Sequence, residues 1–528
     1  MLTLRSVAAL ILLAIAAAPA PYAAATAQPA SLGGAPADGA QAEAVVRERV
    51  EVPGALEPHT PAELNRAVAF RYFLPDAPRP STVLVLVPGL NSGPNTIDIL
   101  ARGLLVAHGP GLEVWIIAPR PTLLQDRRGV EAALAYQQPD FALGYYYGSL
   151  AIGGHQFHML KGAEVPYMAY WGLDVHLRDI FAMVHEVRTR YPNGRVVLGG
   201  HSLGGVLAAA YAGYDFADVP GSSPSDPPRP AEIGAADLTG LLFIDGLPMP
   251  LPLRLSPNRY LHGFHVPFFG TIPGVDNLTE PDPDKRVPPF TRTRNIARTK
   301  DSLIFDVVSV YGYLRPDSAS YFPFYPRRFG LQITNEALVA ALLSDQMQSD
   351  RLIRANVEEP IGIFARVPDH TYTNRQGLLD LQSGYPAPGE ALIRLPRPGE
   401  RPRPRVPIRM LLRAILRPGA DFTEWYFPWR LVLDLGLAAS LEPGDEFAKR
   451  YFSLDHVRDT ALPMLILGAG QGLVRSEGAT DFYRSRVATP RDRITVKIFP
   501  QLSHLDIEDS DPNPAVPLIL TWLESVVH

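Results

Sequence analysis

Arg195–Ala210 reads RVVLGGHSLGGVLAAA, and this stretch decides the fold. Its opening run, Val196 to Leu198, is short and apolar, as is typical of a buried parallel strand. Its end is rich in alanine, which favours a helix. Between the two lies GHSLGG, a G-x-S-x-G pattern centred on Ser202 that links a strand to a helix within a few residues.

The glycines of this turn have a steric role. A chain that passes so abruptly from strand to helix crowds its own backbone, and a Cβ at Gly200 or Gly204 would clash. Ser202 is therefore expected at strained backbone angles, with its hydroxyl held at the strand tip beside the amides of a helix N-terminus. The alternative is an ordinary small-residue turn that carries a surface serine.

This motif, in this setting, resembles the nucleophile elbow of the α/β-hydrolase family in the form found in lipases and esterases. The resemblance covers about residues 45–245 and 462–528. It implies an α/β fold with a mostly parallel sheet flanked by helices, and a large inserted lid or cap.

Composition limits the function classes. Of the 528 residues, 46% are hydrophobic, and the net charge is -5. The apolar fraction is that of a folded globular protein, and the mild negative charge argues against nucleic acid as a main partner. The chain has no cysteine, which excludes disulfides, thiolate metal sites and a cysteine nucleophile. We predict neither a metal site nor a cofactor.

The N-terminus has the pattern of a secretory signal peptide over residues 1–27. Arg5 precedes an apolar core at 7–18, and Ala25-Thr26-Ala27 offers a cleavage site. We expect export to the periplasm or the outside of the cell, with an uncleaved membrane anchor as the alternative. Residues 28–44 are rich in Ala, Gly and Pro and predict a flexible linker.

Two blocks, 45–246 and 456–528, alternate between strand and helix patterns, as expected for a parallel α/β sheet. The first opens with an antiparallel pair. Its predicted strands are 45–52, 67–74, 82–87, 112–118, 196–198 and 238–244, and its helices include 97–108 and 173–190. The second block predicts strands at 462–467 and 494–499 and helices at 479–486 and 515–527.

Residues 247–455 interrupt this alternation with a Pro-rich, aromatic segment that is too long for a loop. Helices are predicted at 302–314, 335–354 and 431–441. The family places its lid here, and such a lid would enclose an apolar cavity over the elbow. Aromatic clusters could line that cavity or form local cores; they lie at 145–147, 157, 171, 260–269, 321–325 and 425–429. An arginine-rich stretch, 394–417, could contact an anionic lipid surface transiently or form a solvated loop.

Ser202 needs a base, and a neutral histidine suits that role. In the family order the histidine follows the last strand, and His504 in Ser503-His504-Leu505-Asp506 stands at that place. His201, beside the nucleophile, is expected to pack or hydrogen-bond locally. The resemblance also implies an oxyanion hole, for which the backbone N–H groups of Leu90 and Leu203 are the candidates.

The acid partner of His504 is less clear, because the loop that usually supplies it reads GAGQGL and has Gln471 at the expected place. Asp245 ends the preceding strand, where lipases resembling those of pancreas carry their acid. Glu477 lies just past the vacant position, and Asp481 lies further into the next helix. We predict Asp245 and keep Glu477 and Asp481 as alternatives.

The leading hypothesis is an exported serine esterase or lipase that acts on apolar esters, such as lipids or polyesters, through an acyl-enzyme on Ser202. A peptidase or amidase could use the same triad. An inactive binding protein on a hydrolase fold is the third possibility.

Overall fold

The computed structural model describes residues 44–218, 220, 230–249, 254–266, 270–292, 302–316, 318, 320, 335–343, 363–365, 371–373 and 406–526. The predicted signal peptide and nearly all of the predicted linker lie outside these residues. So do the aromatic cluster 321–325 and the arginines before residue 406.

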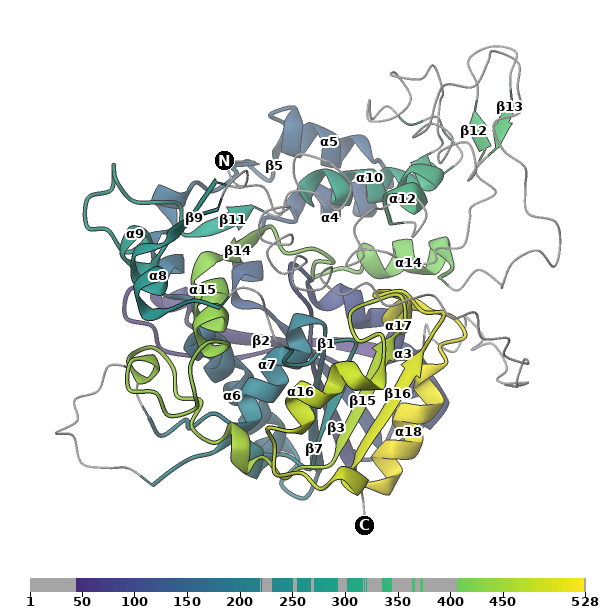
Figure 1. Cartoon of the computed structure of the whole chain (residues 1–528). Coiled ribbons are helices and arrows are strands. Elements are labelled where there is room, and N and C mark those ends of the chain that lie inside the picture. The colour runs from purple at the N-terminus through teal and green to yellow at the C-terminus, as the bar shows by residue number, and fades with distance from the viewer. Residues whose placement is uncertain are drawn as a thin grey trace.

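A single sheet of eight strands forms the centre of the molecule, in the order β1-β2-β4-β3-β7-β8-β15-β16 (Figure 1). The strands are β1 Val46–Pro53, β2 Arg66–Phe73, β3 Thr82–Val87, β4 Leu112–Ala118, β7 Arg195–His201, β8 Gly240–Ile244, β15 Met464–Ala469 and β16 Ile494–Phe499. β2 runs antiparallel to both β1 and β4, and the other neighbours pair in parallel. This order is that of the α/β-hydrolase fold, so the predicted fold class is confirmed.

Helices cover both faces of the sheet because its central strands are apolar on both sides. α6 (Leu173–Arg190) and α7 (Leu203–Ala212) pack on one face against residues such as Val85 and Leu198. α3 (Asp98–His108) and α18 (Ala515–Ser525) pack on the other face, against residues such as Leu86 and Val197. Figure 1 shows the two pairs on opposite sides.

The chain between β8 and β15 lies outside the sheet and contributes α8 Pro257–His262, β9 Phe264–Val266, β10 Gly270–Ile272, α9 Val275–Leu278, β11 Phe290–Arg292, α10 Ser302–Leu314, α12 Asn335–Leu343, β12 Ile363–Ala365, β13 Thr371–Thr373, α14 Ile408–Ile415, β14 Tyr426–Pro428 and α15 Trp429–Ala438. The predicted helix 335–354 is described only to residue 343.

A second core joins this insertion to the connection after β4. Helices α4 (Arg128–Tyr136) and α5 (Asp140–Tyr147) were not predicted, and they share buried contacts with α10, α12 and α14. Tyr145, Tyr146 and Trp171 are buried in this core, which favours the packing interpretation of that aromatic cluster. Figure 1 shows this helical group beyond the ends of the strands, on the side of the sheet where β16 ends and α17 (Asp506–Asp509) begins.

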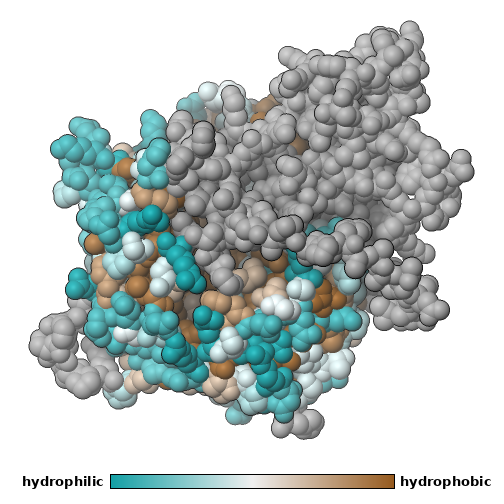
Figure 2. All heavy atoms as spheres, viewed as in Figure 1, coloured by the Kyte–Doolittle hydropathy of each residue, from teal (hydrophilic) through white to brown (hydrophobic). Residues whose placement is uncertain are grey.

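Hydrophilic and hydrophobic residues are interspersed over the described part of the surface that Figure 2 shows. Within the described residues, no helix combines the length and apolar character that a bilayer crossing requires.

Candidate active site

Ser202 lies in the turn between β7 and α7, with φ 55° and ψ -120°. A non-glycine residue rarely adopts such angles, and they persist only where the surroundings enforce them. Two constraints are visible. The Ser202 backbone N–H donates to the carbonyl of Ile244 at 3.0 Å, and a Cβ on Gly246 would stand 2.0 Å from the carbonyl oxygen of Ser202.

The predicted steric role of the glycines agrees with the structure. A Cβ on Gly200 would stand 2.2 Å from the carbonyl carbon of Gly204. A Cβ on Gly204 would stand 1.9 Å from the carbonyl oxygen of Val87, at the end of β3. The elbow is therefore compressed between its own helix and the neighbouring strand.

His504 follows β16 and is almost completely buried, 2% exposed. Its Nδ1 lies 2.6 Å from Oδ2 of Asp245, which directly follows β8 and is fully buried. The two residues are 259 positions apart in the chain and meet because β8 and β16 flank β15 in the sheet. A contact of this kind fixes the orientation of an imidazole and stabilises its cation.

Backbone amides hold the Asp245 carboxylate in place. Oδ1 accepts from the N–H groups of Ala469 (2.9 Å) and Val474 (2.8 Å), and Oδ2 accepts from that of Leu473 (2.9 Å). Ala469 ends β15, and Leu473 and Val474 belong to the loop after it, which has Gln471 at the expected acid position. This loop therefore binds the carboxylate of its neighbour instead of supplying one.

Gly472 makes room for this arrangement. A Cβ at that position would stand 2.0 Å from Asp245 Oδ2. Only glycine leaves the space that the carboxylate occupies. Gly472 is visible in the sequence, but the need for a glycine there follows only from the contact of this loop with Asp245 after β8.

The alternative acids lie elsewhere. The side chain of Glu477 is 68% exposed and pairs with Arg484 at 3.2 Å. Asp481 is 64% exposed and stands 3.6 Å from the same arginine. Of the three candidates, the structure brings only Asp245 to His504.

The two candidate oxyanion donors come from two different segments. Leu203 begins α7, and Leu90 follows Gly89 in the loop after β3. A Cβ on Gly89 would stand 3.0 Å from Cβ of Ser202, so this loop contacts the elbow closely. Gly89 and Leu203 also line a cavity of about 30 Å³, which has room for about two water molecules.

A buried glutamate that sequence reasoning missed lines the same cavity. Glu424, from the insertion, is 2% exposed, and burial raises the pKa of its carboxyl well above the usual value. The cavity is therefore bordered by a side chain from outside the sheet-forming blocks.

The end of the insertion is hydrogen-bonded along the loop that carries Leu90. The N–H groups of Gly93 and Asn95 donate to the carbonyls of Phe422 (2.9 Å) and Asp421 (3.0 Å), and the N–H of Glu424 donates to Asn91 (2.9 Å). Residues 415–425, here called the return segment, thus run beside the candidate oxyanion loop.

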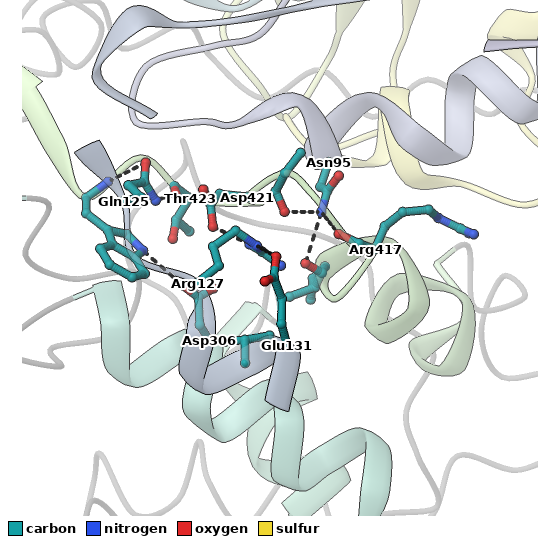
Figure 3. Close-up of polar contacts among 12 residues, drawn as sticks. Asn95, Gln125, Arg127, Glu131, Asp306, Arg417, Asp421 and Thr423 are labelled. Carbon is teal, nitrogen blue, oxygen red and sulfur yellow. Dashed lines mark hydrogen bonds and ion pairs between the residues drawn. The ribbon is translucent and has the colours of Figure 1, made fainter. Parts of the chain in front are cut away.

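Asn95 is the centre of this contact, and its side chain points at the return segment in Figure 3. Its Nδ2 donates to the carbonyls of Ile415 (3.2 Å), Arg417 (3.0 Å) and Ala420 (2.9 Å), and its Oδ1 accepts from Arg47 at 2.9 Å.

Further ion pairs join the return segment to the core. Arg127 contacts Asp421 in Figure 3, and Arg417 stands 3.1 Å from Asp98 on α3. Arg409, from the same arginine-rich stretch, pairs with Glu336. Arg409 and Arg417 therefore have internal partners, which the lipid-surface interpretation of that stretch did not anticipate.

No protein-family model matches the sequence, and no curated protein matches it either. Among solved structures, the chain is similar to a protein described as a lipase from Sulfolobus solfataricus, with 13% identity, TM-score 0.47, and coverage of 91% of this chain and 95% of that one. A carboxyl esterase from Bacillus coagulans gives 11% identity, TM-score 0.35, and coverage of 91% and 99%. A soluble variant of monoglyceride lipase from Saccharomyces cerevisiae gives 8% identity, TM-score 0.33, and coverage of 87% and 92%.

These identities and scores are low, so the fold assignment stands on the strand order and the site on its own geometry. By its strand order and its G-x-S-x-G elbow, the chain resembles the lipases and esterases of the α/β-hydrolase superfamily.

Proposed function

We propose that this protein is a serine hydrolase that cleaves carboxylic esters through an acyl-enzyme on Ser202. His504 takes the proton of the Ser202 hydroxyl as the oxygen attacks the ester carbonyl, and then gives it to the departing alcohol. A water molecule, activated by the same histidine, releases the acid. This chemistry needs no metal or cofactor.

The observation that carries the proposal is the 2.6 Å contact between His504 Nδ1 and Asp245 Oδ2. The ring of His504 also lies 4.3 Å from that of His201, the residue that precedes the strained Ser202. The Asp245 carboxylate also accepts three backbone N–H groups, which hold it in place. It would orient the ring with Nδ1 protonated, which leaves Nε2 as the nitrogen able to accept the serine proton.

Leu90 and Leu203 are the proposed oxyanion donors. The carbonyl oxygen becomes negative during attack, and N–H groups fixed beforehand stabilise that charge without reorganisation. The hydrogen bonds between the return segment and the loop of Leu90 support this role, because they hold that loop in one conformation.

The test is covalent labelling with a fluorophosphonate, followed by hydrolysis assays. We expect folded protein to be labelled at Ser202 and to cleave nitrophenyl esters. A short-to-long acyl series would report the chain-length preference. An aminoacyl-anilide panel, run alongside, distinguishes the peptidase alternative. Absence of labelling and of ester turnover would favour a binding protein on a hydrolase fold.

Export and a lid role for the insertion are also part of the proposal. Residues 1–27 would be removed during export, which N-terminal sequencing of the mature protein checks. The insertion would cover the site, since its return segment is hydrogen-bonded along the loop of Leu90, and an apolar ester such as a lipid or a polyester would bind beneath it.

A further inference from the structure

His201 and Glu508 form a buried pair next to the candidate active site. Glu508, on the short helix α17 that follows His504, is fully buried, and its Oε2 lies 3.0 Å from His201 Nδ1. The other ring nitrogen of His201, Nε2, lies 3.0 Å from the backbone carbonyl oxygen of His504. The residue before Ser202 is therefore connected to the residue that would act as its base.

The backbone carbonyl of His504 determines which nitrogen of His201 carries a hydrogen. A carbonyl oxygen accepts only, so Nε2 of His201 must carry a hydrogen. In a neutral ring Nδ1 is then the acceptor, and the only proton available for the contact is on Glu508. Nδ1 and Oε2 are 3.0 Å apart, within hydrogen-bond range, but the contact is bent away from the direction that a hydrogen or a lone pair on Nδ1 would take, so its distance and not its alignment supports the pair.

The surroundings favour this neutral pair over an ion pair. Burial lowers the pKa of His201 well below its usual value, and His504, with ring centroids 4.3 Å apart, lowers it further. Burial raises the pKa of Glu508 well above its usual value, assisted by Asp509 on the same helix and by Asp245 at the end of β8. A cationic His201 would also oppose the positive charge that His504 must acquire in catalysis.

We propose that Glu508 and His201 are positioning residues that act as an uncharged pair: the protonated carboxyl of Glu508 donates a hydrogen bond to His201 Nδ1, and the His201 Nε2–H donates one to the backbone carbonyl of His504. The inference rests on the proposed function, since it assigns His504 as the base. It adds a second histidine–carboxyl pair behind Asp245–His504, one that orients the base without adding a charge beside it.

Two substitutions of Glu508 separate positioning from packing. In Glu508→Gln the amide N–H₂ can still donate to Nδ1, and we expect kcat and KM within about threefold of wild type. In Glu508→Leu the donor is lost, and we expect kcat to fall on the order of 10- to 100-fold with KM little changed, as when a catalytic group is displaced by about 1 Å. A Glu508→Leu protein with wild-type kcat, or a Glu508→Gln protein that loses as much as the leucine variant, would overturn the proposal.

The pH profile tests the charge. The acid limb of kcat/KM reports protonation of the base in the free enzyme. If Glu508 is neutral, Glu508→Gln leaves the midpoint of this limb unchanged. If Glu508 is ionised, the substitution removes a negative charge near His504 and moves the midpoint to lower pH, and a shift of about half a unit or more would overturn the proposal. This readout remains decisive even if Glu508→Leu does not fold.

Asp509 offers matched controls on the same helix. It is also buried, and burial likewise raises the pKa of its carboxyl. We expect Asp509→Asn to keep the wild-type kcat and acid limb, and Asp509→Leu, if folded, to lack the selective loss in kcat. Fluorophosphonate labelling of the wild type distinguishes failure of the proposed function from failure of the positioning pair. An unlabelled wild type refutes the proposed function. A labelled wild type, together with a Glu508→Leu variant of unchanged kcat, refutes only the positioning pair.

Discussion

Ser202 is buried and its strain lies in the backbone, so a change to alanine removes one oxygen atom and leaves the steric constraints of the elbow in place. Ser202→Ala should therefore fold normally and lose ester turnover by about three to six orders of magnitude. The melting temperature and kcat of the purified variant check both parts. A variant that keeps most of its activity would contradict the acyl-enzyme mechanism.

Substitutions of Asp245 and Glu477 are expected to have different effects on kcat. Asp245→Asn keeps the shape but removes the charge that stabilises the His504 cation, so kcat should fall on the order of 10²- to 10⁴-fold with KM little changed. Glu477→Gln should be nearly silent because Glu477 is exposed and paired with Arg484. Steady-state kinetics of the two variants measure this. The reverse pattern would move the acid to Glu477.

Asp509 gives a prediction about stability. Burial raises the pKa of its carboxyl well above the usual value, and Asp506 and Asp98 raise it further. Above about pH 4 the unfolded chain releases this proton while the folded protein keeps it, so the free energy of unfolding falls as pH rises. In Asp509→Asn that loss is absent.

The stability advantage of Asp509→Asn over wild type should accordingly grow between about pH 4 and pH 7, by up to about 1.4 kcal/mol per pH unit. Urea unfolding at several pH values measures the difference. A difference that stays constant with pH would mean that Asp509 is ionised in the folded protein.

The positions of Ser202, Asp245 and His504 were predictable, because each residue follows a strand with a recognisable apolar pattern. His201 was expected to bond locally, yet its partners are the carbonyl of His504 and Glu508, far away in the chain. No sequence pattern pointed to Asn95 or Glu424, because their roles depend on contacts between the loop after β3 and the return segment, which are more than 300 residues apart in the chain.

At the scale of elements, the regular blocks were predicted well. α6 has the predicted bounds, and the eight strands fall within three residues of the predicted ranges. α4, α5 and α14 were missed, because their apolar faces belong to the second core and do not pack against the sheet. Periodicity alone does not identify the partner of such a face.

Asn95 connects the candidate oxyanion loop to the return segment. Asn95→Ala removes the partner of three carbonyls and of Arg47 in a buried place, so we expect a loss of about 2–4 kcal/mol in unfolding free energy. We also expect kcat to fall about tenfold or more, because Leu90 would no longer be held in place.

The control for Asn95→Ala is Asn277→Ala, which removes a single hydrogen bond to the N–H of Gly274 in α9. This variant should lose some stability but keep its kcat. If Asn95→Ala also kept its kcat at a temperature where it is folded, the return segment would have no part in holding the oxyanion loop.

At the scale of the molecule, the described parts of the insertion pack against the core and are hydrogen-bonded to it. Asp434 on α15 accepts from the backbone N–H of Leu173 at the start of α6 (2.8 Å) and from the hydroxyl of Tyr260 (2.7 Å). A Cβ on Gly172 would stand 2.0 Å from the same carboxylate. Apolar residues of α15 such as Leu431 and Leu433 belong to the buried cluster that covers one face of the sheet.

Removing residues 247–455 should therefore do more than open the site. With β8 and β15 joined by a Gly/Ser linker of about 12 residues, long enough to span one strand, the chain would expose the apolar surface of α6 and leave the start of that helix without Asp434. We expect an aggregated or molten product with no cooperative melting transition. A soluble, cooperatively melting product would show that the sheet and its helices fold alone; its ester chain-length preference, compared with that of the full chain, would then decide whether the insertion selects the substrate.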